Sequence, residues 1–75
     1  MNKKSYIMAV VHVPNRCLYI PEPFPRRSSQ KQIAAVCRDF LNMEVPDWQE
    51  ADITLSYYEK NAYKRNKRLY IKKGE

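Results

Sequence analysis

Glycine is almost missing from this chain, and the single one, Gly74, stands next to the last residue. Phosphate-binding loops of the P-loop and dinucleotide-binding types need several glycines, because a backbone without Cβ atoms must approach the phosphate closely. The glycine-containing signature of the RNA-recognition fold is missing as well. The sequence therefore excludes these classes of nucleotide site, and its turns must be built from Pro, Asn, Asp and Ser.

Histidine and cysteine are scarce too, since the chain has one histidine, His12, and two cysteines, Cys17 and Cys37. Two cysteines cannot form a four-cysteine metal site, and no ligands recur at the short spacings of zinc sites. We expect no metal, no other cofactor and, without a secretory context, no structural disulfide. A histidine on a strand among apolar neighbours indicates a packed or edge residue rather than a general base, and no serine or cysteine has the local signature of an activated nucleophile. We therefore expect no catalytic residues and a non-enzymatic protein; a small ribonuclease using His12 is the least favoured alternative.

Long apolar runs are also missing. The first residues, MNKKSYIMAVVHV, carry two lysines before an apolar run, but Pro14 and Arg16 follow instead of a small-residue cleavage site. No segment approaches the length of a transmembrane helix. We expect a cytoplasmic protein with no membrane partner. A short, basic, glycine-poor chain of this kind is typical of phage and other mobile elements.

The residues that are present predict one small folded domain. Of the 75 residues, 44% are hydrophobic and 29% are charged, which is an ordinary globular composition. We expect the whole chain to form this domain, with disordered termini at residues 1–4 and 74–75. The net charge of +6 favours polyanionic partners, although a charge of that size also serves solubility alone.

Alternating apolar residues and turn residues predict two β-hairpins. Residues 5–13 and 17–20 are expected to form the first, with Pro14 and Asn15 in its turn. Residues 52–58 and 67–73 are expected to form the second, with 59–66 as an unusually long connection.

A helix is predicted between the hairpins, over residues 28–42. Ser29 and Gln32 match a capping box, and the apolar positions recur at helical spacing: Ile33, Val36, Cys37, Phe40 and Leu41. The order is therefore ββαββ, an α+β fold in which one amphipathic helix packs on a mainly antiparallel four-stranded sheet.

Two proline-containing segments flank this helix. The segment PEPFP (21–25) is expected to be a rigid, extended and unpaired connector that places Phe24 on the core. Residues 46–50 suggest a short helical turn, with Trp48 covering one end of the core.

The leading functional hypothesis concerns the sheet face away from the helix, where tyrosines and cations should gather. Tyrosine rings can stack on bases while cations hold phosphates, so we expect RNA or DNA as the partner. The predicted phosphate contacts are Lys64, Arg65, Lys67, Arg68, Lys72 and Lys73, and the predicted stacking residues are Tyr58, Tyr63 and Tyr70.

Other surfaces give alternatives. Arg26, Arg27 and Lys31 flank the predicted helix start and form a candidate second anion site. Met8, Val10 and Tyr19 suggest instead a protein-binding or homodimer face, because exposed apolar patches commonly have a partner. The acids cluster in the middle third of the chain, so we expect them to lie opposite the basic hairpin. No feature indicates a small-molecule substrate.

Overall fold

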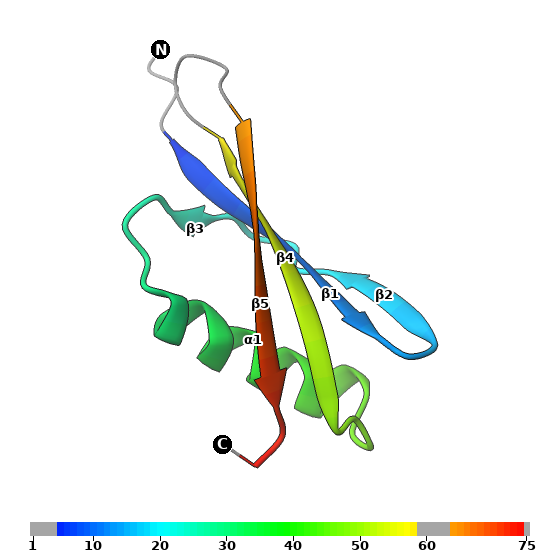
Figure 1. Cartoon of the computed structure of the whole chain (residues 1–75). Coiled ribbons are helices and arrows are strands. Elements are labelled where there is room, and N and C mark those ends of the chain that lie inside the picture. Colours follow the sequence, from blue (N-terminus) through cyan, green and yellow to red (C-terminus); the bar gives the residue numbers. More distant parts are fainter. Residues whose placement is uncertain (1–4, 59–63, 75) are drawn as a thin grey trace.

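One helix covers one face of an antiparallel sheet in the computed structural model, which describes residues 5–58 and 64–74 (Figure 1). The predicted α+β class and ββαββ order are confirmed. The elements are β1 (Tyr6–Val13), β2 (Arg16–Tyr19), β3 (Phe24–Pro25), α1 (Gln30–Glu44), β4 (Glu50–Tyr58) and β5 (Lys64–Lys72).

The main strands are ordered β2-β1-β4-β5, and every neighbouring pair is antiparallel. The short strand β3 pairs with the start of β1, on the same edge as β2, with Ile7 opposite Phe24. The expectation that residues 21–25 are unpaired is therefore wrong at their C-terminal end. Phe24 keeps its backbone N–H between two prolines, and Pro25 is tolerated because β3 lies at an edge of the sheet.

The core lies between α1 and the sheet, and it follows from the alternation of the strands. Ile7, Val11, Ile53 and Leu55 are fully buried on the sheet side. Phe24 and Trp48 both belong to the core as predicted, since Trp48 is 4% exposed and Phe24 is 9% exposed.

Helix α1 begins with the predicted capping box. The Ser29 Oγ accepts a hydrogen bond from the Gln32 backbone N–H at 3.1 Å, and the Gln32 Oε1 accepts one from the Ser29 N–H at 2.9 Å. The buried face consists of Ile33, Ala34, Cys37 and Leu41. Val36 is 45% exposed, so its assignment to the core is wrong. The contact between α1 and the sheet is centred on the side of the helix that carries Cys37 and Leu41, and Val36 lies outside this contact.

The connections differ in detail from the expectations. Pro46 and Asp47 form a turn in place of the expected helical turn over 46–50, with the Trp48 N–H donating to the Val45 carbonyl at 2.9 Å, and β4 already begins at Glu50. Strand β5 begins at Lys64, so the strands extend into the long connection. Tyr63 and the terminal residues 1–4 and 75 lie outside the described residues, whereas Gly74 is described in an exposed turn. Within the described ranges, no helix is both long and apolar enough to cross a membrane.

Candidate functional site

The sheet face opposite α1, here called the open face, is reached by solvent along most of its width. Side chains alternate along a strand, so the residues between the core positions point to this face. Tyr19 is 70% exposed there, Tyr70 is 51% exposed and Tyr6 is 37% exposed. Met8 and Val10 lie beside them and are half-buried by their neighbours.

The register of the strands arranges the open face in rows. An aromatic row consists of Tyr6, Tyr58 and Lys64, taken from β1, β4 and β5. The rings of Tyr6 and Tyr58 are stacked, with centroids 5.0 Å apart and planes inclined by 11°. Such pairs are favourable beyond the area that they bury, so the two rings hold each other in place.

A middle row crosses the sheet four residues further along β1, and it consists of Tyr19, Val10, Thr54 and Arg68. It joins an exposed aromatic ring on β2 to an exposed cation on β5. Met8, Val10 and Tyr19, the predicted protein-binding residues, adjoin one another as expected, because Val10 pairs with Tyr19 and Met8 lies two residues away. The two functional hypotheses therefore require the same face.

A histidine row follows, made of Cys17, His12, Asp52 and Tyr70. The His12 Nε2 lies 3.2 Å from the Thr54 Oγ1, and the Cys17 Sγ lies 3.6 Å from the His12 Nδ1. His12 is exposed and has these polar neighbours, so of the two expected settings, packed or at an edge, the packed one is wrong. In the described part of the chain, no group of three or more His, Cys, Asp and Glu side chains could hold a metal ion.

Charge is distributed unevenly along the sheet. The half of the sheet from its middle to the end where β4 finishes and β5 begins, the upper end in Figure 1, is here called the basic end; its cationic positions are Arg26 and, on β5, Lys64, Arg65, Lys67 and the mid-strand Arg68. The end where α1 finishes and β4 begins, here called the acidic end, carries Glu44, Asp47, Glu50 and Asp52. Arg16, Lys72 and Lys73 nearly balance these four acids, so the acidic end is close to neutral, whereas the first five residues of β5 include four cations.

The predicted phosphate contacts are divided between these two ends. Lys64, Arg65, Lys67 and Arg68 are consecutive or nearly so at the start of β5. Lys72 pairs in register with Glu50 at the other end, and the half-buried Lys73 donates its ammonium hydrogen bond to the Pro46 carbonyl. Lys72 and Lys73 are thus separated from the other four.

The predicted stacking residues are divided in the same way. Tyr58 lies in the aromatic row, whereas Tyr70 lies in the histidine row and donates its hydroxyl hydrogen bond to Glu50. The sequence hypothesis did not include Tyr6 among the site residues. Alternation along the first strand places Tyr6 on this face, but its partner Tyr58 is known only from the strand register.

The second predicted anion site, formed by Arg26, Arg27 and Lys31, is also arranged differently from the expectation. The guanidinium of Arg26 lies over the ring of Tyr57, 5.3 Å from its centroid, and therefore faces the sheet rather than the helix start. The capping box already occupies N–H groups at the N-terminus of α1. Arg27 and Lys31 remain exposed beside it.

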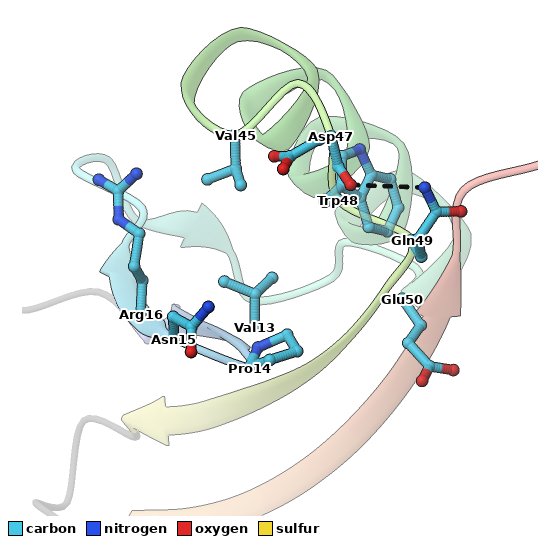
Figure 2. Close-up of a pocket in the computed structure, with 9 residues that line it drawn as sticks. All are labelled: Val13, Pro14, Asn15, Arg16, Val45, Asp47, Trp48, Gln49 and Glu50. Atoms are coloured by element: carbon cyan, nitrogen blue, oxygen red, sulfur yellow. Dashed lines mark hydrogen bonds between the residues drawn. The ribbon is translucent and has the colours of Figure 1, made fainter.

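A surface hollow of about 550 Å³ lies at the acidic end (Figure 2). The β1–β2 turn forms one side of it, and Val45 and Trp48 form the other. The Trp48 Nε1–H donates to the Asn42 Oδ1 at 2.8 Å, which fixes the indole in its wall. Its polar lining, which includes Arg16, Asp47 and Glu50, contains no nucleophile paired with a base.

Comparison with known proteins adds no relative. No protein-family model matches the chain, and no curated protein or solved structure is detectably similar to it. The function has to be argued from the geometry of the open face and from the distribution of charge.

Proposed function

We propose that this protein is a non-enzymatic nucleic-acid-binding protein, and that it binds through the basic end of its open face. One observation carries the proposal: the stacked pair of Tyr6 and Tyr58 lies beside the part of β5 that has four cations in its first five residues. Cations release condensed counterions when they neutralise phosphates, and aromatic rings provide surfaces for bases.

Solubility alone does not account for this arrangement. Scattered cations would serve solubility equally well, whereas these cations follow one another along β5 beside exposed tyrosines. Arg68 has the register of the open face and Lys67 has that of the opposite side, and both are exposed. The phosphate backbone of a nucleic acid that follows the β5 edge could therefore contact cations from both faces of the sheet.

The first prediction compares two changes of equal charge, Arg68→Gln at the basic end and Lys72→Gln at the acidic end. For the wild type, log affinity should fall linearly with log salt concentration, since binding releases counterions. Arg68→Gln should make this slope shallower by about one unit, whereas Lys72→Gln should leave it nearly unchanged. Fluorescence anisotropy with short labelled RNA, single-stranded DNA and duplex DNA at several salt concentrations measures both.

The same titrations show where the proposal fails. Absence of binding to all three nucleic acids at low salt contradicts nucleic-acid binding altogether. Equal loss of slope in the two variants contradicts the assignment to the basic end, because net charge alone would then determine affinity.

A further inference from the structure

The stacked pair of Tyr6 and Tyr58 indicates which form of nucleic acid suits this surface. We infer that the basic end binds single-stranded nucleic acid, with an unpaired base stacked on the Tyr6–Tyr58 pair and the phosphates along β5. This inference rests on the proposed function and names its substrate class.

The aromatic row supplies the first part of the argument. Tyr6 is 37% exposed and Tyr58 is half-buried, so ring surface reaches solvent on the open face. Bases within a duplex already stack on each other and cannot place a face against a protein ring. The bases of single strands can place a face against a protein ring. Each such stack contributes substantially to affinity and does not depend on which base is stacked.

The relation between rings and cations supplies the second part. In both the aromatic row and the middle row, a basic residue lies on β5, and tyrosine lies further across the sheet. The two rows are four residues apart along a strand, or about 13 Å. Phosphates held along β5 would thus allow bases to extend inward over β4 and β1, toward Tyr58, Tyr6 and Tyr19.

The acidic end limits the length of this path. Asp52 and Glu50 occupy the next positions of β4 on the open face, and Tyr70 is hydrogen-bonded to Glu50. Carboxylates repel phosphates, so the strand should cross the aromatic and middle rows and leave the sheet before the histidine row.

Helix α1 offers no alternative means of reading a duplex. Recognition helices enter the major groove with an exposed polar or basic face. The exposed residues of α1 include Lys31 near its start but also Asp39 and Glu44, and its Arg38 donates from Nε to the Lys72 carbonyl at 3.3 Å. The aromatic and basic surface of the sheet is accordingly the favoured contact.

The test compares a 12-nucleotide single strand with a duplex of the same sequence, by fluorescence anisotropy at one salt concentration. We expect the single strand to bind at least tenfold more tightly. Tyr58→Leu should weaken single-strand binding about tenfold, because it removes a ring and keeps an apolar strand residue. Tyr70→Leu, at the acidic end, is the matched control and should change affinity by less than twofold.

A second readout reports stacking itself. A single strand that contains 2-aminopurine should lose fluorescence when the base stacks on the wild-type protein, and Tyr58→Leu should restore part of it. Tyr6→Leu provides a second variant if Tyr58→Leu melts at a lower temperature, since it removes the other ring of the same pair.

The possible results separate the two proposals. Equal affinity for single strand and duplex overturns the single-strand inference and leaves nucleic-acid binding in place. Unquenched 2-aminopurine, or equal losses for Tyr58→Leu and Tyr70→Leu, overturns the stacking role. If neither nucleic acid binds at low salt, the proposed function fails and the inference fails with it.

Discussion

Cys17 and Cys37 differ at the residue scale because of their surroundings. Cys37 is fully buried between α1 and the sheet, and burial raises the pKa of its thiol from 9.0 to about 11, since a thiolate is poorly solvated there. Cys17 is exposed on the open face, with its Sγ near the His12 ring. Both thiols are free. Cys37 is therefore a packing residue whose neutral form the fold requires.

This requirement predicts how stability depends on pH. Between about pH 9 and pH 11, the unfolded thiol loses its proton while the folded one keeps it, so the free energy of unfolding should fall as pH rises. Two pKa units correspond to at most about 3 kcal/mol. Urea unfolding of the wild type and Cys37→Ala at pH 8 and pH 10.5 measures the effect. The stability difference between the two proteins should narrow at the higher pH, and a constant difference would contradict the assignment.

At the scale of the element, features that depend on local spacing could be predicted from the sequence, whereas features that depend on strand pairing could not. The capping box and most of the buried face of α1 follow from residues three or four positions apart, and they could be predicted from the sequence. The strand β3 and the Tyr6–Tyr58 pair depend on which distant residues become neighbours. No local pattern contains that information, so the site could be placed on a face but not at one end of it.

The capping box gives a prediction for α1 as an element. Ser29→Ala removes the hydroxyl that accepts from the Gln32 N–H, and should lower the free energy of unfolding by about 1 kcal/mol. Ser28→Ala is the neighbouring control; the Ser28 backbone N–H bonds to the Pro25 carbonyl, which the substitution keeps. Ser28→Ala should change the free energy of unfolding by less than about 0.5 kcal/mol. Equal losses in urea unfolding would show that the cap does not stabilise the helix.

At the scale of the whole molecule, the cations of β5 have two explanations. Strand β5 is the last in the sheet order, and positive side chains on an edge strand oppose edge-to-edge association. The molecule is also elongated, with extents of 41 × 20 × 18 Å, so the separation of charge along it would orient it on a polyanion. The edge-strand charge favours a monomer, and under the proposed function the charge separation would direct the basic end toward nucleic acid.

Val10→Glu distinguishes this monomer from a dimer formed through Met8, Val10 and Tyr19. We expect light scattering to give a mass near 9.0 kDa for the wild type and for Val10→Glu. The new carboxylate would lie in the middle row that also contains Tyr19 and Arg68, and should weaken single-strand binding several-fold.

Asn15→Glu is the control for that experiment, because it makes the same change in charge at the exposed β1–β2 turn, at the acidic end of the molecule. It should weaken binding less than Val10→Glu does. A wild-type mass twice that of the chain, reduced to one chain by Val10→Glu but not by Asn15→Glu, would assign the open face to a second copy of the protein. The surface proposed for nucleic acid would then be covered in the dimer, and binding would require the dimer to dissociate.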